Sequence, residues 1–116
     1  MALRKLVDRF TKPVEELDRQ DLTEFCDRLQ ATPIDAVESR RPVRIAGEVR
    51  SVRIVPRAGA DALEVTVNDG RASVVGVFLG RRKIVGISPG RKVIFEGVVV
   101  PSGKARQIYN PIYTLL

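Results

Sequence analysis

Five runs of strand-forming residues, separated by turns rich in glycine and proline, fill the chain from residue 43 to residue 116. Each run alternates apolar and polar residues or carries the β-branched residues that favour strands. The stretch RRKIVGISPG between the third and fourth runs has room for one short helix. We therefore predict a mainly β protein, a five-stranded Greek-key barrel with a short helix between strands 3 and 4. The predicted strands are VRIAGEVRSVRIV (43–55), LEVTVN (63–68), SVVGVFLG (73–80), KVIFEGVVV (92–100) and ARQIYNPIYTLL (105–116).

The first run is long, and its apolar side changes partway along. In its first half the apolar residues Val43, Ile45 and Val49 lie on one face of the strand. The polar residues Arg44, Glu48 and Arg50 lie on the other. After Ser51 the apolar positions move to Val52 and Ile54, which predicts a β-bulge between Gly47 and Ser51. A strand with such a bend pairs at both ends of a small barrel; an ordinary twisted strand of a sandwich is the alternative. This order of runs is that of the OB-fold barrel, whose exposed face commonly binds nucleic acid or sugar.

The residues ahead of the barrel carry a helical pattern. An apolar stripe over residues 3–10 predicts a short helix, and Pro13 is well placed to begin a second one. We expect the helical segment to break near Gln20. The predicted organisation is a helical arm with a connecting loop at 1–40 and an OB-fold barrel at 41–116. The arm either packs on its own barrel or offers a surface for a partner protein or a second copy of the chain.

Charge is divided unevenly between these two parts. Residues 1–40 hold 7 basic and 9 acidic groups, a balance of −2. Residues 41–116 hold 13 basic and 5 acidic groups, a balance of +8, and the whole chain carries +6. A barrel with this charge attracts polyanions, and nucleic acid is the usual one. A merely solvated basic surface is the alternative.

The residues that catalysis and metal binding need are scarce. The chain has no histidine, so it lacks the side chain that most often serves as a general base or as an imidazole metal ligand. Its single cysteine, Cys26, has no partner for an internal disulfide and no companions for a zinc site. No apolar run is long enough to span a membrane, and no G-x-x-x-x-G-K phosphate loop occurs. We expect a cytoplasmic protein that is not an enzyme and that uses no cofactor or metal.

Nine basic residues of the barrel are the candidate nucleic-acid ligands. Arginine suits this role because its planar guanidinium bonds phosphate through two N–H groups and also stacks on bases. Four of them form a predicted ridge along strand 1 and the first loop: Arg44, Arg50, Arg53 and Arg57. Two occupy the last loop, where we expect them to meet Arg57 across a groove: Lys104 and Arg106. The remaining three form the densest basic cluster and could clamp a phosphate backbone: Arg81, Arg82 and Lys83.

Aromatic residues contribute less to this prediction. Only Tyr109 and Tyr113 are candidates for stacking on bases, and each is as compatible with a packed ring whose hydroxyl lies at the rim. Strand 3 is apolar on both faces, with Val75, Val77 and Leu79 alternating with a second set that includes Phe78. One set must enter the core. We expect the other to be covered by the N-terminal helices or by an oligomer contact.

These motifs resemble those of OB-fold nucleic-acid-binding proteins. The resemblance rests on VRIAGEVRSVRIV followed by a D-G turn, then on FLGRR, ISPGRKVIFEGVV and NPIY, and covers about 43–116. The chain is similar to small stand-alone OB proteins of high-GC bacteria and to the wedge OB domain of the branched-DNA helicase RecG. Its first strand also looks like the anticodon-binding OB domain of class II aminoacyl-tRNA synthetases. This resemblance implies binding rather than catalysis.

The resemblance also assigns roles to particular residues. In the synthetase-type domain an arginine late in strand 1 grips a base, and Arg53 fits that position. The position of the aromatic residue of strand 2 falls near Glu64 in this chain. In the helicase wedge the segment after strand 3 reaches the DNA fork, and Gly80-Arg81-Arg82 takes that place. We therefore predict non-catalytic binding of single-stranded or branched DNA, or of RNA. The alternative is a protein-interaction or oligomerisation module that uses the barrel as a docking platform.

Overall fold

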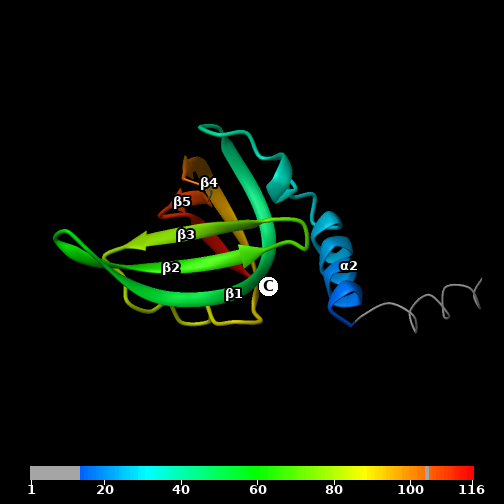
Figure 1. Cartoon of the computed structure of the whole chain (residues 1–116), viewed down its shortest axis with the longest axis horizontal. Coiled ribbons are helices and arrows are strands. Elements are labelled where there is room, and N and C mark those ends of the chain that lie inside the picture. The colour runs from blue at the N-terminus through cyan, green and yellow to red at the C-terminus, as the bar shows by residue number, and fades with distance from the viewer. Residues whose placement is uncertain (1–13, 104) are drawn as a thin grey trace, which may run out of the picture.

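The computed structural model of the protein describes residues 14–103 and 105–116 (Figure 1). One α-helix precedes a single six-stranded sheet in this part of the chain. The protein is therefore mainly β, as predicted. The helix predicted over residues 3–10 and the candidate ligand Lys104 lie outside the described residues. The elements are α2 (Val14–Asp27), the 3₁₀ turn η1 (Ile34–Ala36), β1 (Pro42–Arg57), β2 (Ala60–Asn68), β3 (Ser73–Leu79), β4 (Lys92–Ser102), β5 (Ala105–Tyr109) and β6 (Ile112–Leu115).

The sheet closes into a ring because β1 pairs with two strands. The strand order is β1-β2-β3-β5-β4-β6, and a further pairing joins β1 to β4. The first half of β1 pairs with β4 over 42–48, and its second half pairs with β2 over 48–57. The register against β2 shifts between Val49 and Ser51, which confirms the predicted bulge. Among the strands of the described residues, β3 and β5 are the one parallel pair. This closed order is that of an OB-like fold.

The connection between β3 and β4 differs from the prediction, because it contains turns rather than a short helix. Two of its glycines, Gly86 (φ 90°) and Gly90 (φ 94°), adopt left-handed backbone that does not continue a helix, and Pro89 lacks an N–H donor. The buried side chains of Ile84 and Ile87 anchor this connection to the core. The segment therefore runs along the ring in two turns.

The last predicted strand is also divided, into β5 and β6. Asn110 lies between them with a φ of 49°, and Pro111 follows. The Asn110 N–H donates to the carbonyl of Val77 at 2.7 Å, and its side-chain Oδ1 accepts from the N–H of Leu79 at 2.9 Å. These two bonds to the end of β3 hold the bend. As a result β5 pairs with both β3 and β4, whereas β6 pairs with β4.

The core inside the ring consists almost entirely of valine, isoleucine, leucine and phenylalanine. Phe95 on β4 is its largest fully buried side chain, and the ring of Phe78 lies edge-on to it at 5.8 Å. A Cβ on Gly76 would lie 2.6 Å from the Phe95 ring, so glycine at this position of β3 makes room for that ring. Each fully buried side chain of this size contributes roughly 1.5–3 kcal/mol of hydrophobic stabilisation.

Helix α2 packs on the outside of β1 and β4. Its buried residues Leu22 and Cys26 contact Ala46 and Ile94 in a second, smaller apolar cluster. Helix α2 therefore does not cover strand 3. Cover by the N-terminal helices was one of the two alternatives expected for the outer face of that strand. It also runs unbroken past Gln20, because one apolar face continues along its length. No helix in the described part of the chain is long and apolar enough to cross a membrane.

Candidate nucleic-acid interface

Four neighbouring strands present one row of residues on their outward face. Arg53 on β1 lies opposite Glu64 on β2, Glu64 lies opposite Val77 on β3, and Val77 lies opposite Tyr109 on β5. Residues opposite each other in a sheet place their side chains on the same face. Arg57 joins this row through its contacts with Glu64 and Tyr109. We call this group of five residues the Glu64 row.

The carboxylate of Glu64 is the electrostatic centre of the row. One oxygen accepts a hydrogen bond from Arg53 Nη2 at 3.1 Å, and the other accepts one from Arg57 Nη2 at 3.3 Å. The Glu64 side chain is only 11% exposed, whereas those of Arg53 and Arg57 are 72% and 34% exposed. A carboxylate this buried needs compensating charge. The two guanidinium groups supply it and leave the cluster with a net positive charge on its solvent side.

Arg57 also lies against an aromatic ring. Its guanidinium carbon is 5.7 Å from the ring centroid of Tyr109. The phenol oxygen of Tyr109, followed by the Glu64 carboxylate, raises the pKa of Arg57 above its ordinary value. The Tyr109 hydroxyl in turn donates to Oε1 of Gln107 at 2.9 Å. Because Tyr109 is 42% exposed, the row presents a phenol ring and a guanidinium to solvent side by side.

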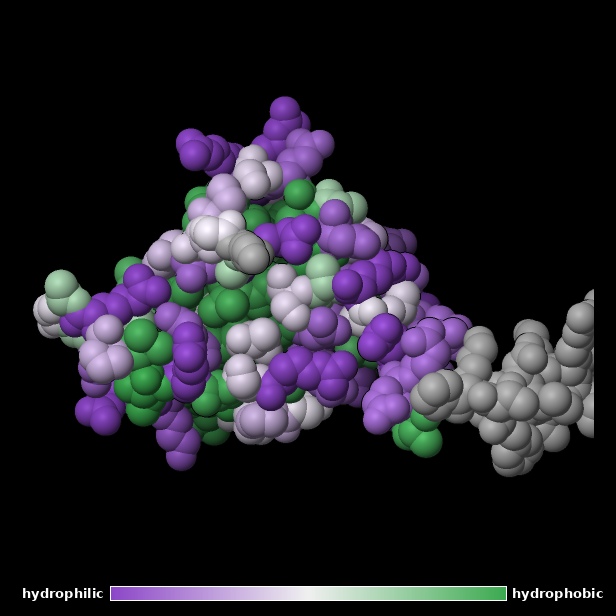
Figure 2. Space-filling model, in the orientation of Figure 1, coloured by the Kyte–Doolittle hydropathy of each residue, from purple (hydrophilic) through white to green (hydrophobic). Residues whose placement is uncertain are grey.

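Val77 forms the floor of the row. It faces away from the core, yet it is fully buried. The side chains of the row therefore cover the outward side of β3 at this point, where the sequence had suggested helices or an oligomer contact. Figure 2 shows apolar surface gathered around the middle of the visible face, with hydrophilic residues around it.

Part of the basic cluster after β3 lies at the end of the sheet where β1 ends at Arg57 and β2 begins. The N–H of Gly80 donates to the carbonyl of Asp61 at 2.8 Å, and Arg82 pairs with the Asp61 carboxylate at 3.5 Å. This places the residues after β3 beside the start of β2. Arg81 and Lys83 are exposed, and neither makes an ion pair with another described residue. Their charges are therefore available to an anion.

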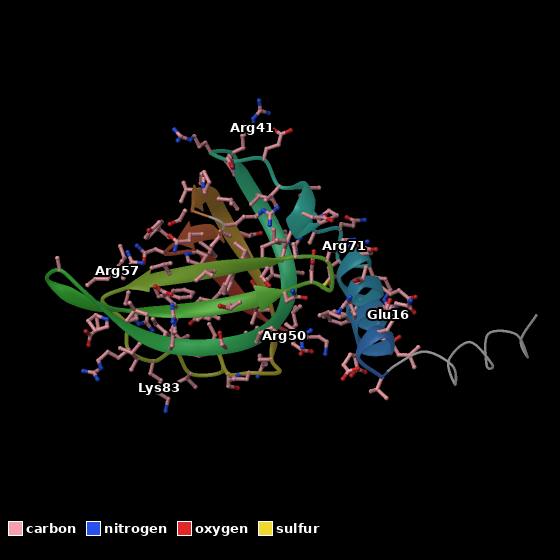
Figure 3. All side chains as sticks on the ribbon, in the orientation of Figure 1. Glu16, Arg41, Arg50, Arg57, Arg71 and Lys83 are labelled. Carbon is pink, nitrogen blue, oxygen red and sulfur yellow. The ribbon has the colours of Figure 1, made fainter. Side chains whose placement is uncertain are left out.

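The predicted ridge along β1 divides into two parts. Arg53 and Arg57 belong to the Glu64 row, whereas Arg44 pairs with Glu96 of β4 at 3.6 Å and Arg50 pairs with Glu48 at 3.1 Å. Arg44 lies on the part of β1 that pairs with β4, and Arg50 lies at the bulge. In Figure 3, Arg50 and Arg57 are well separated along β1. The shift in alternation at the bulge keeps all four arginines on the outward side of β1, and the length and bend of this strand separate the two pairs.

Arg106, expected to meet Arg57 across the face, lies on the other side of its strand. Arg106 pairs with Pro101 of β4 and occupies the same side of β5 as the buried Ile108. Its neighbour three residues on, Tyr109, is the residue of β5 that contacts Arg57. Among the described residues, Tyr109 of β5 rather than Arg106 makes the contact with Arg57 from this side of the face. Tyr113 on β6 packs its ring edge-on to Phe78 at 5.9 Å.

A second polar surface lies between α2 and the β2–β3 turn. An open cleft of ≈ 570 Å³ there has both acidic and basic walls. Arg71 is one of its lining residues and donates to both carboxylate oxygens of Asp27 at 3.0 Å. These bonds lower the pKa of Asp27 below its ordinary value. The cleft is lined by Glu15, Asp18, Arg19, Arg50, Asn68, Gly70 and Arg71. Its opposite charges largely neutralise each other, so it is a poor polyanion site.

The described residues contain no group of three or more histidine, cysteine or acidic side chains that could hold a metal ion. Cys26 lies on the buried face of α2, where burial, followed by the charges of Asp69 and Asp27, raises the pKa of its thiol to about 11. A thiol with this pKa is a poor nucleophile at neutral pH.

A solved structure resembles the fold described above. The chain superimposes on part of a protein described as "Structure of RecG bound to three-way DNA junction", with a TM-score of 0.62 and 17% sequence identity. The match covers 72% of this chain and 12% of the RecG chain, so the chain corresponds to a small part of that protein. At this identity the similarity concerns the fold, and it supports the OB-like assignment. No protein-family profile matches the chain, and neither does any curated protein.

Proposed function

We propose that this protein binds single-stranded or branched nucleic acid, DNA or RNA, without catalysing a reaction on it, through the outward face of an OB-fold barrel. The observation that carries the proposal is the Glu64 row, in which Arg53 and Arg57 from β1 meet Tyr109 from β5 on one exposed face. The RecG structure supports it, because its fold is shared and its description names a DNA junction. The balance of +8 over residues 41–116 supplies the general attraction for a polyanion.

The chemistry of the row suits a nucleic-acid strand. Each guanidinium uses one N–H group on Glu64 and keeps further donors for phosphate oxygens. The half-exposed ring of Tyr109 offers a face for a base, and stacking of this kind is worth about 1–3 kcal/mol per base. Phosphate contacts and stacking are the two interactions that single-strand binding needs. We assign Arg81 and Lys83 to additional phosphate contacts at the edge of this face.

Fluorescence anisotropy with a labelled single-stranded oligonucleotide tests the proposal. Wild-type protein is expected to bind at low salt and to lose affinity steeply as salt rises. Replacing Arg53→Gln and Arg57→Gln together removes two phosphate contacts but keeps amide donors for Glu64. We expect this variant to bind at least about tenfold more weakly, with a log–log salt slope shallower by about 1.4, since each single-strand phosphate contact contributes about 0.7.

The matched control is the pair Arg19→Gln and Arg41→Gln. These arginines are exposed, pair with Glu16 and Glu38, and lie away from the Glu64 row, but their loss changes the net charge by the same amount. The control should keep most of the affinity. Equal losses in the two variants would show that net charge, rather than this face, is responsible, and absence of binding by the folded wild type at low salt would refute the proposal.

A further inference from the structure

Glu64 has no evident role in binding a phosphate backbone. Its carboxylate lies between Arg53 and Arg57 at the middle of the row, and a phosphate approaching those arginines would be repelled by it. Among the described residues on the outward face of β2, β3 and β5, Glu64 is the one carboxylate. The outward carboxylate of β1, Glu48, lies at the other end of the β1–β2 pairing and is paired with Arg50. Two arginines alone would bind phosphate better. The carboxylate therefore calls for an explanation other than backbone binding.

The carboxylate still has capacity to accept hydrogen bonds. Each of its oxygens can accept about two, and each receives one from an arginine, so roughly one position per oxygen is unused. The contact with Arg53 is also easy to exchange, because the Arg53 side chain is 72% exposed. A ligand can therefore draw Arg53 outward onto a phosphate and approach Glu64 with its own N–H groups.

The distance from Glu64 to Tyr109 suits a stacked base. The two residues are aligned across β2, β3 and β5, with the small side chain of Val77 between them. Adjacent strands lie about 4.8 Å apart, so the two backbones are separated by about 10 Å. The Arg57 side chain contacts both residues, so a base reaches this position by displacing it toward solvent. A base that stacks on the ring of Tyr109 can then direct its Watson–Crick edge over Val77 toward the carboxylate. Single-stranded bases are commonly read in this way, on that edge.

Resting on the proposed function, we propose that Glu64 makes this face selective for guanine. The Watson–Crick edge of guanine presents two neighbouring donors, N1–H and N2–H, which match the two oxygens of a carboxylate. Adenine and cytosine each offer one amino donor beside a ring nitrogen that accepts, and the ring nitrogen would be repelled by the second oxygen. Thymine and uracil place a carbonyl on each side of their one N–H donor. Guanine is therefore the base that fits best.

The test compares base analogues on the intact wild-type protein. A short oligothymidylate is the reference strand, and single central positions are changed to deoxyguanosine, deoxyinosine or 7-deazadeoxyguanosine. We expect the guanine strand to bind about tenfold tighter than the reference, as for a good bidentate pair. Deoxyinosine lacks the N2 amino group and should lose most of this gain, whereas the 7-deaza analogue keeps the whole edge and should retain it.

The variant Glu64→Gln provides the second measurement. Its amide would set a donor against a donor of guanine, so the preference for the guanine strand should disappear. The oligothymidylate should bind more tightly, because a carboxylate that repels phosphate is lost. A wild type that binds all four strands equally, or a preference that survives in Glu64→Gln, would overturn this inference and leave the proposed function intact. Absence of binding to every strand would overturn both.

Discussion

The carboxylate of Asp69 accepts a hydrogen bond from the backbone N–H of Ile34 at 2.8 Å. This bond joins the β2–β3 turn to the segment that follows the helical arm, 35 residues earlier in the chain. The same carboxylate accepts from the N–H groups of Arg71 and Ala72 at 2.9 and 3.0 Å, and Asp69 itself is 1% exposed. Thr23 on α2 donates to its backbone oxygen at 3.0 Å. Asp69 therefore connects the arm to the ring of strands.

Replacing Asp69 should destabilise the whole protein. Asp69→Ala would leave three backbone donors without a partner, and we expect the free energy of unfolding to fall by about 3 kcal/mol or more. Asp69→Asn keeps one acceptor oxygen and should cost about half as much. Urea denaturation measures both. Asp61→Ala, which removes only the exposed pair with Arg82, is the control and should change stability by less than about 1 kcal/mol.

Gly76 and Phe95 should behave as a coupled pair. A Cβ at Gly76 lies 2.6 Å from the Phe95 ring, so Gly76→Ala should destabilise by about 1–3 kcal/mol through overpacking. In a Phe95→Leu background the ring atoms that cause this clash are gone, and the same alanine should cost less. A double-mutant cycle by denaturation measures the coupling. Additive losses would contradict the packing described for β3 and β4.

The thiol of Cys26 should make stability depend on pH in the alkaline range. Its pKa is raised from 9.0 to about 11 in the folded protein, so the folded state holds the proton more tightly than the unfolded chain. The resulting stabilisation is fully present below pH 9 and is lost as pH rises from 9 toward 11. Wild type and Cys26→Ala should therefore become closer in unfolding free energy as pH rises over this interval. A constant difference would contradict the burial of the thiol.

Tyr109 should contribute to binding without contributing to salt dependence. Tyr109→Leu removes a stacking surface. We expect the binding free energy for a single strand to weaken by about 1–3 kcal/mol, while the log–log slope of affinity against salt concentration stays unchanged. Tyr113→Leu is the matched control, because the Tyr113 ring packs on Phe78 and lies outside the Glu64 row. It should lower thermal stability and leave affinity close to wild type. Anisotropy titrations at several salt concentrations separate the two effects.

Several features of the fold were predictable because they depend on short-range patterns. The move of the apolar positions after Ser51 located the bulge of β1, and Asn68-Asp69-Gly70 marked the turn after β2. The helix expected between β3 and β4 was wrong, because the glycines of that segment adopt left-handed backbone that length alone does not reveal. The division of the last strand at Asn110 was missed for the same kind of reason, since it depends on two hydrogen bonds to the distant end of β3.

The candidate site was predicted only in part. Charge counting identified the basic part of the chain and included Arg53 and Arg57 among the candidate residues, but it grouped them with Arg44 and Arg50. Those two lie farther back along the bent strand β1 and pair with Glu96 and Glu48. The sequence had suggested Tyr109 as a stacking residue without indicating what it would contact. Its position relative to Arg57 depends on the parallel register of β3 and β5.

By itself, the amino-acid sequence determined the strand content, the bend of the first strand and the excess of positive charge on residues 41–116. These properties follow from residues that are adjacent or a few positions apart, where backbone preference and side-chain alternation act directly. Only the tertiary structure decided which charges share a face, and that Glu64 is enclosed by Arg53 and Arg57 beside Tyr109. That arrangement requires three strand registers to be set together, and those registers come from packing the whole core rather than from any one segment.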